Sequence, residues 1–199
     1  MVNNISKLIK LPFRYKPWRP AHLDIIFNDI SGLSRQPVHA DEVHLEATIN
    51  WLCRAQDQRM GQKDQGGISA GWSFEDGWLP SYPETSGYII ETLLAAEKIL
   101  NNPVLNIRAE KIVDWELSIQ NADGSFPGHF GEIASKPVIF NTGQIMHGMI
   151  AGYLAFKRNE CLEAAVNAGK WMVSKQDDDG CWRRSVHNDT PHTYNTRSA

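Results

Sequence analysis

The sequence has little cysteine, no strong excess of either charge and no apolar run of the secretory type. Its three cysteines, Cys53, Cys161 and Cys181, lack CxxC spacing, which predicts free thiols in a reducing compartment and therefore a cytoplasmic protein. A net charge of −3 gives no reason to expect nucleic acid as a partner. The basic N-terminal residues are not followed by an uninterrupted apolar stretch, which argues against a signal peptide.

The first forty residues are interpreted as a basic extension and a connector. Residues 1–20 carry five Lys or Arg and no acid, so weak contact with an anionic membrane surface is one hypothesis. A solvated tail or a strap packed on the domain is the other. Residues 21–40 contain Gly32 and Pro37 among scattered apolar residues, and we expect little regular structure there.

Two motifs recur along the rest of the chain and predict a tandem repeat. A Trp followed five residues later by Gln occurs three times, and after the last two copies the Gln leads into an acidic turn with Gly and an aromatic residue, at 120–126 and 176–182. A Pro placed five residues before a Thr also occurs three times, at Pro80, Pro137 and Pro191. Because Pro pre-sets the backbone at a helix start, each Pro predicts the beginning of an equivalent helix. Repeats longer than 50 residues with two helices each are typical of stacked helical hairpins.

Hydrophobic periodicity places the helices within this repeat. We expect a long loop at 57–81 and helices at 41–56, 84–100, 105–120, 138–156 and 159–176. The predicted N-terminal caps are Asp41, Asn159 and a capping box of Ser81 with Glu84. In the last helix, Leu162, Val166 and Val173 are expected to face inward. The segment 138–156 has no charged residue, but its polar groups and glycines favour a helix buried in protein over a membrane span.

The chain from residue 41 to 199 resembles the alpha/alpha-toroid group that includes terpenoid cyclases and protein prenyltransferases. Their recurring Gln-x(2-5)-Gly-x-Trp element is similar to Gln120–Phe126 and Gln176–Trp182. The resemblance implies an all-α fold in which outer and inner helices alternate around a ring, with the Gln and the aromatic residue in structural roles. With about two and a half hairpins, we expect an open arc, either a C-terminally truncated fragment of a ring or an arc that pairs through its open C-terminal flank.

The resemblance also implies where a site lies, because the inner helices begin at the central cavity. We expect catalysis from His192, Tyr194 and Arg197, and substrate binding from six further polar residues: Tyr82, Glu84, Asn141, Gln144, His147 and Asn195. No cofactor is expected. A structural role is the alternative for several of these residues, since His192, Asn195 and Glu84 are also suited to capping helices and His147 to a core position.

Residue chemistry separates the functions that this group carries. Asp177–Asp179 lies in a turn and does not match the acid motif of triterpene cyclases. Asp179, Cys181 and His192 superficially resemble the zinc ligands of prenyltransferases, but the register is wrong and we expect no metal. The polar set with nearby tryptophans favours a carbohydrate substrate, as in toroid proteins of bacterial surface-polysaccharide biosynthesis, with lyase or epimerase chemistry on uronic-acid sugars. A non-catalytic helical-repeat scaffold or binding module is the alternative.

Overall fold

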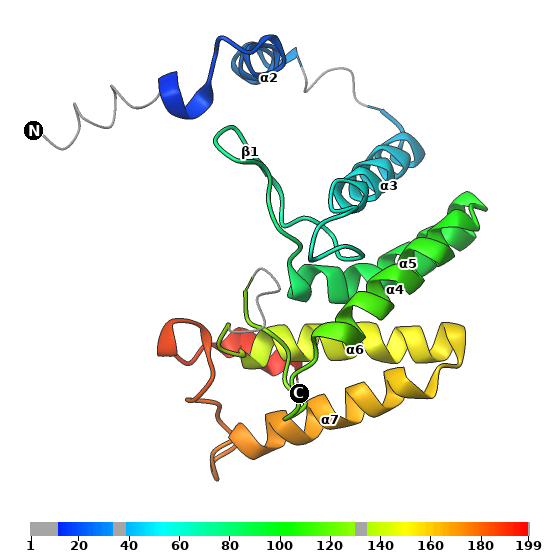
Figure 1. The fold of residues 1–199 in the computed structure, drawn as a ribbon, viewed down its shortest axis with the longest axis vertical. Coiled ribbons are helices and arrows are strands. Elements are labelled where there is room, and N and C mark those ends of the chain that lie inside the picture. The colour runs from blue at the N-terminus through cyan, green and yellow to red at the C-terminus, as the bar shows by residue number, and fades with distance from the viewer. Residues whose placement is uncertain (1–11, 34–38, 130–134, 199) are drawn as a thin grey trace, which may run out of the picture.

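The computed structural model describes residues 12–33, 39–129 and 135–198, and it confirms an all-α fold (Figure 1). Within these residues the only strands are β1 (Trp72–Ser73) and β2 (Gly77–Trp78), a two-residue antiparallel pair. The helices are α2 (Pro20–Ser31), α3 (Asp41–Asp57), α4 (Pro83–Leu100), α5 (Val104–Ile119), α6 (Ile139–Phe156) and α7 (Asn159–Lys175), followed by the short 3₁₀ helices η2 (His187–Asp189) and η3 (Thr193–Ser198). The predicted boundaries of α3 to α7 agree to within a few residues.

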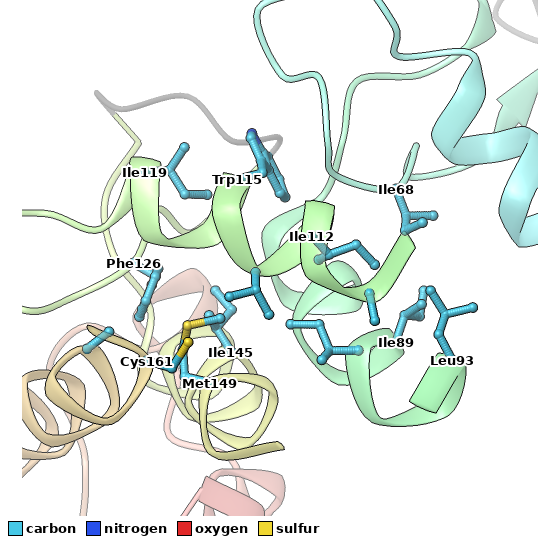
Figure 2. Close-up of a cluster of buried hydrophobic side chains, with 14 of the residues drawn as sticks. Ile68, Ile89, Leu93, Ile112, Trp115, Ile119, Phe126, Ile145, Met149 and Cys161 are labelled. Carbon is cyan, nitrogen blue, oxygen red and sulfur yellow. The ribbon is translucent and has the colours of Figure 1, made fainter. Parts of the chain in front are cut away.

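Helices α4 and α6 form the centre of the molecule. Helix α4 packs against α5 and α6, while α6 packs against α7 and η3. Their side chains make one apolar core, in which Ile112, Ile145 and Met149 are fully buried (Figure 2). The two helices approach closely at a pair of glycines, because a Cβ atom on Gly148 would lie 2.2 Å from the carbonyl oxygen of Gly87.

The recurring Gln side chain links each outer helix to the next. Gln56 Nε2 donates to the carbonyl of Gly66 in the following loop (2.9 Å) and to that of Arg108 in α5 (3.0 Å). Gln120 Nε2 likewise donates to Gly124 (3.0 Å) and to Ala164 in α7 (2.9 Å). We call each Gln with its following loop a clasp: the first is 56–67, the second 120–126 and the third 176–182.

The glycines of the first two clasps pack against α5 and α7, respectively. A Cβ atom on Gly66 would lie 2.8 Å from the Lys111 carbonyl oxygen in α5, and one on Gly124 would lie 2.5 Å from the Asn167 carbonyl oxygen in α7. Both glycines have positive φ, so they serve the turn and the close contact together. The first two clasps therefore hold consecutive hairpins in a fixed register.

The expectation of irregular structure at 21–40 is wrong, because Pro20–Ser31 forms α2. Pro20 occupies the first helical turn and Gly32 ends the helix in the left-handed conformation, so these two residues bound a helix. The helix lies against the β1–β2 turn through His22, whose ring is 5.3 Å from the rings of both Trp72 and Phe74. The N-terminal segment 1–11, with Lys7 and Lys10 of the basic extension, lies outside the described residues.

The predicted caps are also wrong. The residues at the cap positions of α3, α4 and α7 are Ala40, Tyr82 and Arg158, and none makes a side-chain capping bond. Ser81 instead donates its hydroxyl to the carbonyl of Asp64, which ties the start of α4 to the preceding loop. Differences of one residue at helix ends are common, but the Ser81 contact is a different interaction.

The predicted inward face of α7 is wrong as well. Leu162, Val166 and Val173 are 40%, 46% and 68% exposed, while the smaller residues Ala164, Ala165 and Ala168 face the core. Helix α6 is buried as predicted over most of its length, between α4 and α7. In the described parts of the chain, every helix is too short or too polar to cross a membrane.

Candidate functional site

An open groove of about 600 Å³ runs along the exposed edge where α4, α6 and η3 meet. The lining residues of α4 lie one or two helical turns apart, and so do those of α6. The short helix η3 adds the guanidinium of Arg197. The lining residues are Glu84, Tyr88, Glu91, Thr92, Phe140, Gln144, His147 and Arg197. The groove therefore collects four residues expected from the sequence: Glu84, Gln144, His147 and Arg197.

Glu84 is the most perturbed carboxyl group in the groove. Burial in the first turn of α4 raises its pKa, while a hydrogen bond with Tyr82 and the nearby imidazole of His187 oppose that rise. A carboxyl group with a raised pKa is closer to the range in which it exchanges protons near neutral pH. Glu84 is therefore the strongest acid–base candidate in the groove.

Tyr88 lies one helical turn from Glu84 and faces both Glu84 and Arg197. Burial raises the pKa of its hydroxyl, the negative charge of Glu84 raises it further, and the Arg197 guanidinium opposes the rise. The hydroxyl is therefore protonated at neutral pH and can donate a proton or a hydrogen bond. These interactions show that an anion, a cation and a neutral donor share one wall of the groove.

Tyr82 and Asn141 support the groove from its side. Asn141 Nδ2 donates to the Tyr82 hydroxyl (3.2 Å) and to the carbonyl oxygen of Gly128 (2.8 Å). Tyr82 in turn hydrogen-bonds Glu84. Neither residue lines the groove, so the structure assigns them the positioning of Glu84 and leaves their expected direct contact with substrate without support.

Gln144 and His147 form the α6 wall. Gln144 is only 6% exposed, and its amide nitrogen has no hydrogen-bond acceptor within the described residues. His147 Nε2 lies 3.3 Å from the carbonyl oxygen of Arg197, which links α6 to η3. A buried donor without an acceptor costs about 1–3 kcal/mol, and a ligand oxygen in the groove is one way to satisfy it.

The expected catalytic pair His192 and Tyr194 lies beside the groove and does not line it. The two rings stack at 4.9 Å between centroids, and the Tyr194 ring meets the groove residue Phe140 edge-on at 4.8 Å. Asn195 is buried at 4% exposure, and its backbone N–H donates to the His192 carbonyl oxygen at 3.2 Å. The stacked pair thus forms an aromatic rim next to Phe140, separate from the charged groups around Glu84.

Sequence reasoning missed Tyr88, Glu91, Thr92 and Phe140. A signal for them existed, because Tyr88 and Glu91 follow Glu84 at spacings of one and two helical turns, and Phe140 precedes Gln144 and His147 on one face of α6. The missed residues supply the protonated hydroxyl and the second acid of the groove.

The acidic turn of the third clasp is held by arginines. Arg183 pairs with Asp179 (2.7 Å) and with Asp177 (3.1 Å), and this contact holds the pKa of Asp179 at about 2. No group of three or more His, Cys, Asp or Glu side chains within the described residues is arranged to hold a metal ion. Asp177 and Asp179 are therefore part of a paired surface turn.

Comparisons of the chain with protein-family models, with curated proteins and with solved structures find no match. The groove and its residues are consequently the basis for assigning a function.

Proposed function

We propose that the chain is an arc of an alpha/alpha toroid whose groove binds and modifies an acidic carbohydrate in bacterial surface-polysaccharide biosynthesis. The observation that carries the proposal is the convergence of Glu84, Tyr88 and Arg197 in one groove. A guanidinium recognises a uronate carboxylate through paired hydrogen bonds, and a carboxyl group with a raised pKa suits proton transfer. The alternation of helices and the two clasps that join them support the toroid part of the proposal.

The proposed chemistry begins at the carbon next to the uronate carboxylate. Arg197 pairs with the carboxylate and stabilises the negative charge that develops when the neighbouring C5 proton leaves. Glu84, ionised, accepts that proton. In a lyase the C4–oxygen bond then breaks and Tyr88 donates a proton to the departing oxygen; in an epimerase a proton returns to C5 from the other face.

The remaining groove residues have binding roles in this proposal. The Gln144 amide donates to a sugar hydroxyl, which gives its buried nitrogen an acceptor. Phe140 with the stacked Tyr194 and His192 offers aromatic surface to a sugar ring at the rim. The polar lining disfavours a terpenoid cyclase or a prenyltransferase, whose substrates require an apolar cavity.

The test is incubation of the chain with a panel of uronate oligosaccharides in deuterated water. We expect deuterium at C5 or an unsaturated product, increasing as pH rises through the raised pKa of Glu84, because the base acts in its ionised form. Glu84→Gln should abolish exchange while leaving binding within about threefold, and Arg197→Gln should weaken binding about tenfold or more. Glu91→Gln, in the same groove, is the matched control and should change neither strongly.

The alternative is a non-catalytic helical-repeat binding module, which is favoured by the openness of the groove. Binding of the oligosaccharides without C5 exchange or elimination would support this module. Absence of both binding and exchange across the panel would contradict the carbohydrate proposal as a whole.

A further inference from the structure

The third clasp is formed, but within the described residues no helix is docked on it. Gln176 Nε2 donates to the Gly180 carbonyl oxygen at 2.9 Å, as in the other two clasps, yet the second bond to an outer helix is missing. Gly180 has positive φ like Gly66 and Gly124, but a Cβ atom there would meet nothing within 4 Å. The third clasp therefore presents a free docking surface.

Each clasp contacts the docked helix at the same two positions, counted back from the repeated Trp of that helix. The carbonyls that bind Gln belong to Arg108 and Ala164, each seven residues before its Trp. The carbonyls under the clasp glycine belong to Lys111 and Asn167, each four residues before it. The same two positions therefore define the docked face in both α5 and α7.

Helix α3 has this face, and no clasp from the described residues lies on it. The positions seven and four residues before Trp51 are His44 and Ala47, and both are exposed. Trp51 itself is 39% exposed, although it contacts Trp78, whereas Trp115 and Trp171 are each 4% exposed. The third clasp and α3 are therefore complementary. Among the described residues, the third clasp has no helix docked on it, and α3 has no clasp docked on it.

Charge and size also match across this joint. In the first clasp Asp57, directly after Gln56, pairs with Arg108 at 2.8 Å. The equivalent pair at the free ends is Asp177 with His44, an acid with a residue that can carry positive charge. Asp177 also pairs with Arg183 and Arg184 of its own turn. Ala47 corresponds to Lys111 and Asn167 of the two docked helices, so its smaller side chain fits the joint without a clash.

Both ends also expose large apolar side chains that an association can bury. On α7 these are Leu162, Val166 and Val173, and on α2, the helix before α3, they include Leu23, Phe27 and Ile30, which are 53% to 81% exposed. Exposed apolar surface of this kind favours association.

We propose that a second copy of this chain docks head to tail on the third clasp. Gln176 of one copy donates to the His44 carbonyl oxygen of the second copy, where it replaces the Thr48 hydroxyl that donates to this oxygen at 2.8 Å. Gly180 packs on the carbonyl of the second copy's Ala47. Such a contact uses two different surfaces, so it joins copies into a ring or an open row. The proposal does not depend on the chemistry of the groove.

Analytical ultracentrifugation of the 199-residue chain over a range of concentrations tests the contact. We expect concentration-dependent association that weakens about tenfold or more in Gly180→Asn, and in His44→Asp, which places an acid opposite Asp177. Asn tolerates the left-handed backbone of Gly180 while adding bulk at the joint. The matched controls are Gly77→Asn, at another open positive-φ glycine at the start of β2, and Asn50→Asp, which adds the same charge on a different side of α3. Both should associate like the parent chain, and circular dichroism checks that all four variants are helical.

Mixing the two disabled chains gives the decisive result. The Gly180→Asn chain keeps its α3 face and the His44→Asp chain keeps its clasp, so one intact joint forms between them. We expect each variant alone to be monomeric and the mixture to form a one-to-one dimer and nothing larger. A parent chain that stays monomeric up to roughly millimolar concentration, association insensitive to both substitutions, or a mixture that stays monomeric would each overturn the proposal.

Discussion

The second and third clasps have the same local structure and different surroundings. In both, the residue after Gln donates its backbone N–H to the residue after Gly (2.9 Å in each), and an Asp carboxylate accepts from the backbone N–H two residues later. Only the second clasp has an outer helix docked on it, through the Ala164 carbonyl. The turn is therefore encoded by its own residues, and docking of the next helix adds a separate interaction.

The largest expected difference between the two clasps is at their glycines. Gly124→Ala places a Cβ atom 2.5 Å from the Asn167 carbonyl oxygen, whereas Gly180→Ala meets open space. Both substitutions strain a positive-φ backbone, which costs about 1 kcal/mol, and the clash adds about 2 kcal/mol or more at Gly124 alone. Urea unfolding at a concentration where the chain is monomeric measures the difference, and equal losses would show that Gly124 is not tightly docked.

A second difference lies in the residue directly after the repeated Trp. This position is Glu116 in α5, Leu52 in α3 and Met172 in α7. Glu116 is fully buried, and neither of its carboxylate oxygens has a hydrogen-bond partner among the described residues. Burial raises its pKa well above the ordinary value for Glu. Glu116→Met should therefore raise the free energy of unfolding at neutral pH by about 2 kcal/mol.

The pH dependence of stability checks the same assignment. The folded chain keeps Glu116 protonated while the unfolded chain ionises it, so the folded state binds more protons. The free energy of unfolding should then fall as pH rises above the ordinary Glu pKa, by up to about 1.4 kcal/mol per pH unit, until the raised folded pKa is passed. Glu116→Met and Glu116→Gln should both remove this slope, and a slope that persists in both would assign it to other groups.

A smaller difference is expected at the glutamines. Gln120→Ala removes two hydrogen bonds, one of which holds α7, and Gln176→Ala removes one within its own turn. At about 1 kcal/mol per bond, the first substitution should cost roughly twice as much as the second. The measurement is urea unfolding of the monomeric chain, and a cost at Gln176 that matched the cost at Gln120 would indicate that both clasps are docked.

The smallest effect is expected on the surface of the third clasp. Arg183 pairs with Asp177 and Asp179, but the side chains of Arg183 and Asp179 are more than half exposed to solvent, which screens their interaction. Arg183→Ala should leave the unfolding transition essentially unchanged at moderate salt, even though the pKa of Asp179 should then rise from about 2 toward its usual value. A pH titration followed by NMR measures the pKa of Asp179, and urea unfolding measures the stability of the same variant. A large loss of stability would mean that the turn depends on Arg183.

The sequence predicted the repeat because the recurring Trp, Gln and Pro act through local geometry. It does not predict α2, because Pro and Gly are typical both of loops and of helix boundaries, and Pro20 and Gly32 occupy boundaries here. The outward face of Leu162 and Val166 was not predictable either, because an apolar pattern does not reveal whether a partner covers it.

The candidate site was predictable in part for a similar reason. Glu84, Gln144, His147 and Arg197, which the sequence predicts for a site, line one groove. Their separation from His192 and Tyr194 depends on the path of the chain after α7, which no periodicity encodes. The place of Tyr88 beside Glu84 follows from helical spacing alone.

Hydrogen exchange of the side-chain amides tests most directly whether the same clasp is docked in two repeats and open in the third. NMR can follow the Nε2 protons of Gln56, Gln120 and Gln176 separately in a dilute, monomeric sample. The account predicts slow exchange at Gln56 and Gln120, whose two bonds hold both protons, and fast exchange at Gln176. Equally slow exchange at all three, or equally fast exchange at all three, would contradict it.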